Sequence, residues 1–186
     1  MTGTQPLDLD EILAGIRAWI EIESPTDDPD GMARMAARVQ ADYEAFGVRV
    51  ERIVGRDGFG DHLLAVDDRH CPPEATAGPG LLILSHIDTV HPIGTLAGPL
   101  PFRIEGDRAY GPGAEDMKGG TYLALAALRQ IGRAGLKTHL PVRHQVAKCW
   151  QFLSSKWYTT GASSGESSRY VALAKLSAFS SGLSPV

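Results

Sequence analysis

Residues 81–84 are four consecutive large aliphatic side chains, Leu-Leu-Ile-Leu, and this run constrains the fold more than any other feature. A short apolar run that ends at a polar residue, here Ser85, is typical of a β-strand covered on both faces. Such strands occur in α/β proteins, where helices pack against a sheet. We therefore expect an α/β fold with a mixed β-sheet flanked by helices.

The pattern of apolar residues before residue 144 agrees with this class. Apolar residues at helical spacing predict helices, and alternating or continuous apolar segments predict strands. The predicted helices cover residues 8–22, 32–46 and 117–132; the predicted strands cover 48–54, 62–66, 81–85 and 140–144, with a hairpin over 101–110. We expect a loop over residues 24–31, and we expect Gly47 to close the second helix, because glycine adopts the left-handed conformation common at that position.

The composition changes abruptly near residue 144. Residues 1–144 contain two serines and carry a formal charge of -7, whereas residues 145–186 contain ten serines and carry +3. A serine-rich segment of this length buries too little apolar surface to fold alone. We predict that residues 1–144 are the N-terminal part of a catalytic domain and that residues 145–186 are a divergent, poorly ordered tail.

Charge and composition exclude several functional classes. The formal net charge of -4 argues against a nucleic-acid-binding protein, which needs a positive surface. The sequence has no apolar stretch long enough to span a bilayer and no secretory signal, so we expect no membrane association. Its two cysteines form no disulfide framework. These features favour a cytoplasmic protein.

Two polar residues, His86 and Asp88, follow directly after the predicted buried strand. In open α/β sheets, ligands bind just beyond the carboxyl ends of strands. Residues i and i+2 of an extended segment point the same way, so the Asp88 carboxylate can orient the His86 imidazole for a metal ion. The alternative is that His86 merely ends the strand and Asp88 caps a turn.

A second polar segment, Gly111-Pro-Gly-Ala-Glu-Asp116-Met-Lys-Gly-Gly120, lies between the predicted hairpin and the last helix. Its glycines permit sharp turns and close backbone approach. Asp116 either takes part in a site with His86 or caps the helix that follows. The segment matches neither a dinucleotide-binding loop nor a Walker loop, since the glycine spacing and the residue after Lys118 are wrong for them.

Four segments in this order resemble the zinc exopeptidase/deacylase family that includes glutamate carboxypeptidase, acetylornithine deacetylase, succinyl-diaminopimelate desuccinylase and aminoacylase. The segments are Ser-His-Ile-Asp-Thr-Val (85–90), Gly-Thr-Leu-Ala (94–97), the run from Pro101 to Gly113, and Asp-Met-Lys-Gly-Gly (116–120). The resemblance covers residues 8 to about 144 and is greatest to the glutamate carboxypeptidase branch. It implies a zinc metallopeptidase or amidohydrolase that cleaves amide bonds in a small N-acyl amino acid or peptide.

The resemblance also implies roles for the candidate residues. His86 would ligate one zinc ion, Asp116 would bridge two zinc ions, and Asp88 would be the catalytic-site acid that orients His86. Two zinc ions held in this way activate one water and polarise the amide carbonyl. In the family, a glutamate further along the chain acts as general base, and a later domain mediates dimerisation; we expect that domain to be absent from this chain.

The family pattern breaks after the strand ending at His144. An Asp-Glu-Glu sequence is expected there, but this chain has Gln145-Val-Ala-Lys and no further carboxylate until Glu166. Cys149 matches no zinc-ligand spacing. We therefore predict a truncated or frame-altered fragment that binds zinc weakly and lacks appreciable hydrolase activity. The alternative is a non-catalytic binding protein that retains the fold without the general-base glutamate.

Overall fold

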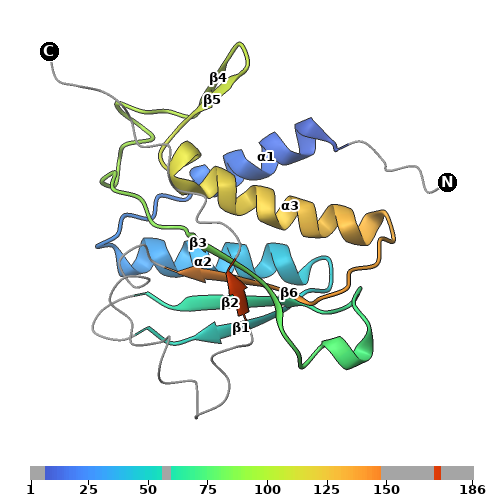
Figure 1. Cartoon of the computed structure of the whole chain (residues 1–186). Coiled ribbons are helices and arrows are strands. Elements are labelled where there is room, and N and C mark those ends of the chain that lie inside the picture. The colour runs from blue at the N-terminus through green and yellow to red at the C-terminus, as the bar shows by residue number, and fades with distance from the viewer. Residues whose placement is uncertain (1–6, 56–59, 148–169, 173–186) are drawn as a thin grey trace, which may run out of the picture.

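The computed structural model describes residues 7–55, 60–147 and 170–172. These residues form three α-helices, a five-stranded sheet and a separate hairpin (Figure 1). The helices are α1 (Leu9–Ile20), α2 (Pro29–Glu44) and α3 (Gly119–Arg133), with short helical turns η1 (Pro73–Ala75) and η2 (Ala114–Lys118). The strands are β1 (Arg49–Ile53), β2 (His62–Asp67), β3 (Gly80–His86), β4 (Arg103–Glu105), β5 (Arg108–Tyr110), β6 (Val142–Ala147) and β7 (Tyr170–Ala172).

The main sheet is mixed and has the strand order β1-β2-β6-β3-β7. Strand β2 pairs antiparallel with β1 and β6, whereas β3 pairs parallel with β6 and β7. A parallel pair requires a long crossover connection. Between β3 and β6 that connection contains the β4–β5 hairpin and α3. The predicted α/β class with a mixed sheet is confirmed.

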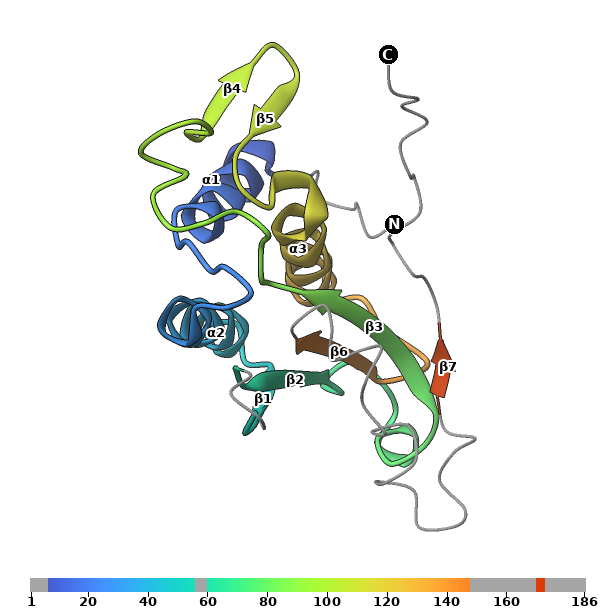
Figure 2. The same ribbon diagram turned by 90° about the vertical axis from the view of Figure 1, so that its left-hand side faces the viewer.

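The three helices lie on one side of the sheet (Figure 2). Strand pairing places Ala65 opposite His144, and His144 opposite Ile83, so these side chains share the face toward the helices. The apolar core lies between that face and the helices, with Trp19 and Val39 fully buried. The β4–β5 hairpin projects away from the sheet beyond α1 (Figures 1 and 2).

Strand β3 is less buried than its sequence predicts. The four aliphatic residues at 81–84 are only partly buried, although we expected cover on both faces. The α-helices formed by residues 7–55 and 60–147 all pack against one face of the sheet, so no helix in these ranges covers the other face of β3. By strand alternation Leu82 and Leu84 point to the opposite face, whereas Leu81 and Ile83 pack, partly buried, against the apolar core.

The helix starts show where the sequence prediction succeeds and where it is wrong. Helix α1 is capped by Asp8, whose carboxylate accepts a hydrogen bond of 3.0 Å from the backbone N–H of Glu11. Helix α2 begins at Pro29, inside the predicted loop 24–31. Asp28 caps this helix and Pro29 occupies its first turn, where a missing N–H costs nothing. The helix ends at Glu44 with Ala45 as its C-cap residue, so the predicted closure by Gly47 is wrong; Gly47 lies two residues further on, in the turn before β1, with a φ of +82°.

The predicted boundary at residue 144 lies within a strand, because β6 continues to Ala147. We predicted that residues 145–186 are poorly ordered, but most of these residues lie outside the described ranges. Of the tail after β6, only Tyr170–Ala172 is described, as an edge strand beside β3. No helix in the described residues is long and apolar enough to cross a membrane.

Candidate metal centre

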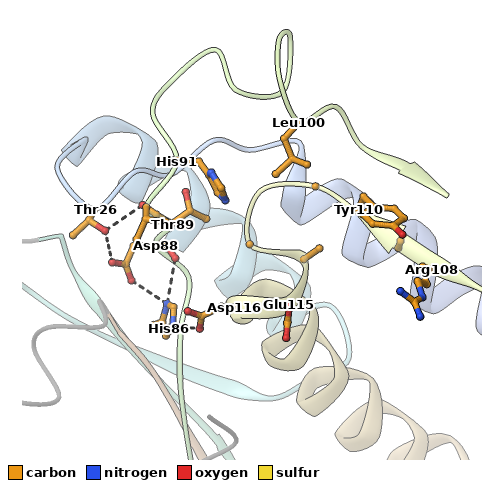
Figure 3. Close-up of a pocket in the computed structure, with 15 residues that line it drawn as sticks. Thr26, His86, Asp88, Thr89, His91, Leu100, Arg108, Tyr110, Glu115 and Asp116 are labelled. Carbon is orange, nitrogen blue, oxygen red and sulfur yellow. Dashed lines mark hydrogen bonds and ion pairs between the residues drawn. The ribbon is translucent and has the colours of Figure 1, made fainter. Parts of the chain in front are cut away.

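A cavity of about 630 Å³ lies at the carboxyl end of β3 (Figure 3). This is the edge of the sheet where α/β proteins bind ligands. Its polar lining comes from three parts of the chain that are far apart in sequence. These are the loop before α2, the end of β3 with the residues after it, and the segment from the hairpin to η2. The lining side chains include Thr26, His86, Asp88, His91, Arg108, Tyr110, Glu115 and Asp116.

His86 and Asp116 meet in this cavity. The Nε2 atom of His86 lies 3.0 Å from the Oδ1 atom of Asp116. Asp116 has non-helical backbone angles within η2, and its side chain is 78% exposed. It does not cap α3, whose N-cap residue is Lys118 and has no side-chain cap. The structure therefore favours convergence with His86 over the alternative helix-capping role.

Asp88 lies on the other side of the His86 imidazole. Its Oδ1 atom is 3.2 Å from Nδ1, and its side chain is only 3% exposed. Burial alone would lower the pKa of His86, but the two nearby carboxylates outweigh burial, so the pKa is raised. The backbone carbonyl oxygen of Asp88 also lies 3.2 Å from Nδ1. Both oxygens are acceptors, so they favour the tautomer with the proton on Nδ1, and Nε2 is the nitrogen that faces the cavity and Asp116.

Lys118, two residues after Asp116, anchors this segment to the end of α1. The side chain is fully buried, and its ammonium donates hydrogen bonds to the carbonyl oxygens of Trp19 (3.2 Å) and Ile22 (2.6 Å). These carbonyls lie at the C-terminal end of α1, where a positive charge is favourable. Burial lowers the pKa of Lys118 to about 8, against the opposing effect of nearby acidic groups.

Gly113 permits the close packing of the segment that carries Asp116. Its φ is +73°, a left-handed conformation that other residues rarely adopt. A Cβ atom at this position would lie 2.8 Å from Cγ2 of Thr89. Only glycine therefore fits between the residues after β3 and the start of η2.

Nε2 of His86 and Oδ1 of Asp116 are placed as two ligands of a zinc ion would be. Imidazole nitrogen and carboxylate oxygen are both zinc ligands, and two ligands of one tetrahedral zinc ion lie about 3.4 Å apart. The observed 3.0 Å between Nε2 of His86 and Oδ1 of Asp116 is close to that separation. Zinc sites use three or four protein ligands, and residues 7–55, 60–147 and 170–172 contain no group of three His, Cys, Asp or Glu side chains that could hold a metal. The described part of the chain thus provides an incomplete ligand set.

The sequence of this region matches a known family. Residues 82–146, which include His86, Asp88 and Asp116, match the model of peptidase family M20/M25/M40. The chain is also 32% identical to carboxypeptidase G2 of Pseudomonas sp. (strain RS-16) over 128 residues. That alignment covers 69% of this chain but only 29% of carboxypeptidase G2.

Solved structures of peptidases share the fold. Human carnosine dipeptidase 1 superposes with a TM-score of 0.60 at 19% identity, over 75% of this chain and 32% of that protein. The M20 family metallo-carboxypeptidase Sso-CP2 of Sulfolobus solfataricus gives a TM-score of 0.57 at 20% identity, over 75% of this chain and 31% of that protein. The chain thus spans about a third of the length of these relatives.

Proposed function

We propose, from the match of residues 82–146 to the model of peptidase family M20/M25/M40, that this chain is the N-terminal part of a zinc-dependent hydrolase of amide bonds. The proposed substrate is a small N-acyl amino acid or peptide, as in a metallo-carboxypeptidase or deacylase. The similarity to carboxypeptidase G2 supports the carboxypeptidase branch.

The observation that carries the proposal is the arrangement of Asp88, His86 and Asp116. The buried Asp88 carboxylate faces Nδ1 of His86, and Nε2 lies 3.0 Å from the exposed Asp116 carboxylate. An acid behind a histidine fixes the tautomer and ring orientation that a metal ligand needs. In this proposal, His86 and Asp116 hold zinc and Asp88 orients His86. The bound zinc would activate water and polarise the substrate carbonyl.

One observation favours the second candidate, a non-catalytic protein, for the chain as it stands. In strand β6, Ala147 pairs with His86, so the end of β6 lies beside the proposed zinc ligand. The family resemblance places the general-base glutamate and a further zinc ligand just after this strand. In this sequence the residues after β6 are Lys148-Cys-Trp-Gln151, and no carboxylate follows until Glu166. We therefore expect the chain alone not to hydrolyse an N-acyl glutamate.

A chimera separates the two candidates. Residues 1–146 of this chain would be joined to the part of carboxypeptidase G2 that follows its aligned region, and hydrolysis of an N-acyl glutamate would be measured. The enzyme proposal predicts zinc-dependent hydrolysis by the chimera, abolished by Asp116→Asn. A folded chimera that binds zinc at the site but shows no hydrolysis would favour the non-catalytic candidate.

A further inference from the structure

The segment 24–26, which joins α1 to α2, lies directly against residues 87–89 that follow β3. Pro25 and Thr89 form a parallel bridge. The Thr89 N–H donates to the Ser24 carbonyl (2.9 Å), and the Thr26 N–H donates to the Thr89 carbonyl (3.0 Å). The Ser24 hydroxyl donates to the Ile87 carbonyl over 2.7 Å. Segment 24–26 is therefore bound to Ile87 and Thr89, the two residues on either side of Asp88 in the chain.

Within this register, the Thr26 hydroxyl reaches the Asp88 carboxylate. Thr26 Oγ1 lies 2.7 Å from Asp88 Oδ2 and 3.2 Å from the Thr89 carbonyl (Figure 3). The hydroxyl has one proton, and both the shorter distance and the charge of the acceptor favour donation to Asp88. The other carboxylate oxygen, Oδ1, is the one that faces His86 Nδ1. The two oxygens of Asp88 are thus directed to two different partners.

We propose that Thr26 is a positioning residue, whose hydroxyl fixes the Asp88 carboxylate and thereby directs Nε2 of His86 into the cavity. The inference deepens the proposed zinc function and rests on it. A donor on Oδ2, in addition to His86 on Oδ1, restricts rotation of the Asp88 carboxylate about its Cβ–Cγ bond. Thr26 lies 62 residues before Asp88, so only the fold brings the two together.

Three matched variants test this role in the full chain. Thr26→Val removes the hydroxyl at nearly constant volume, and Thr26→Ser keeps it. Thr95→Val makes the same change at a buried threonine, whose hydroxyl donates to the Pro92 carbonyl (2.6 Å) and not to Asp88. Zinc affinity is measured by competition with a chromophoric chelator, and unfolding midpoints are measured in parallel.

We expect Thr26→Val to weaken zinc binding by roughly 10-fold, the lower end of the effects seen for groups that orient a metal ligand. Thr26→Ser is expected to restore most of the affinity, and Thr95→Val to retain it. Unchanged affinity in Thr26→Val would overturn the inference. Equal losses in Thr26→Val and Thr95→Val would also overturn it, because they would indicate a general loosening of the loops.

A metal-free readout separates this inference from the zinc proposal. The ring ¹⁵N chemical shifts of neutral His86 report which nitrogen carries the proton. We expect the Nδ1–H form to dominate in the parent chain and in Thr26→Ser, and the Nε2–H form to increase in Thr26→Val. If the parent chain binds no zinc, the zinc proposal fails, and the tautomer comparison alone decides the role of Thr26. Identical tautomer populations in all three proteins would contradict that role.

Discussion

The ammonium group of Lys118 donates a hydrogen bond of 2.6 Å to the carbonyl oxygen of Ile22, which lies 96 residues earlier in the chain. A second hydrogen bond joins the same ammonium to the Trp19 carbonyl. Two residues before Lys118 lies Asp116, so these contacts tie the proposed zinc ligand to the end of α1. The Lys118 side chain is fully buried, and its removal leaves a cavity and takes one hydrogen-bond donor from each of the Trp19 and Ile22 carbonyls.

We predict that Lys118→Ala lowers the free energy of unfolding by about 3 kcal/mol, from the lost side-chain packing and the lost hydrogen bonds. Urea unfolding followed by circular dichroism measures the change. Lys137→Ala is the control, because Lys137 is exposed. A loss no larger than that of the control would show that Lys118 does not anchor this region.

Gly113→Ala is expected to destabilise the fold more than Gly135→Ala. Both glycines have a left-handed φ, +73° and +61°, so both substitutions cost about 1 kcal/mol in backbone strain. At Gly135 a Cβ atom would meet nothing within 4 Å, whereas at Gly113 it would lie 2.8 Å from Thr89. The additional overpacking at Gly113 is worth about 1–3 kcal/mol. Equal unfolding free energies for the two variants would contradict the close packing seen between η2 and the residues after β3.

Because His144 is buried, we predict that the folded protein becomes less stable as the pH falls. His144 is fully buried between the hydroxyl groups of Tyr43 and Ser85, with 2.6 Å between Nε2 and the Ser85 oxygen. Burial lowers its pKa from 6.5 to about 3. Between these values the unfolded chain takes up a proton that the folded chain does not, so stability falls as the pH drops from 6.5 toward 3.

The contribution of His144 to this fall is about 1.4 kcal/mol per pH unit within that range. Urea unfolding at several pH values between 4 and 7 would compare the parent chain with His144→Gln and His139→Gln. We expect a shallower dependence in His144→Gln alone, since His139 is exposed. The same slope in all three proteins would be incompatible with a buried, neutral His144.

The sequence predicts the α/β class and the order of the elements because these follow from local periodicity. It predicts less well how deeply each strand is buried. The run at residues 81–84 indicates cover on both faces, but burial depends on which elements pack there. The start of α2 was misplaced because the capping signal of Asp28 and Pro29 lies within a segment that also has turn-forming residues.

For the site, the sequence spacing indicates that Asp88 can reach His86, since the two are near neighbours. The approach of Asp116 to His86 comes from the family resemblance, because 30 residues separate the two. Thr26 and Lys118 could not be found in this way. Their contacts join segments more than 60 residues apart, and neither residue type indicates by itself a role beside a metal ligand.

The most direct test of the account is a zinc titration of the full chain and of the variants His86→Ala, Asp116→Asn and His139→Ala. Competition with a chromophoric chelator gives the dissociation constant for each protein. With only two ligands in the described residues, we predict weak binding by the parent chain, unchanged binding by His139→Ala and no binding by the two site variants. Zinc binding by His86→Ala and Asp116→Asn as tight as that of the parent chain would contradict a metal centre at these residues.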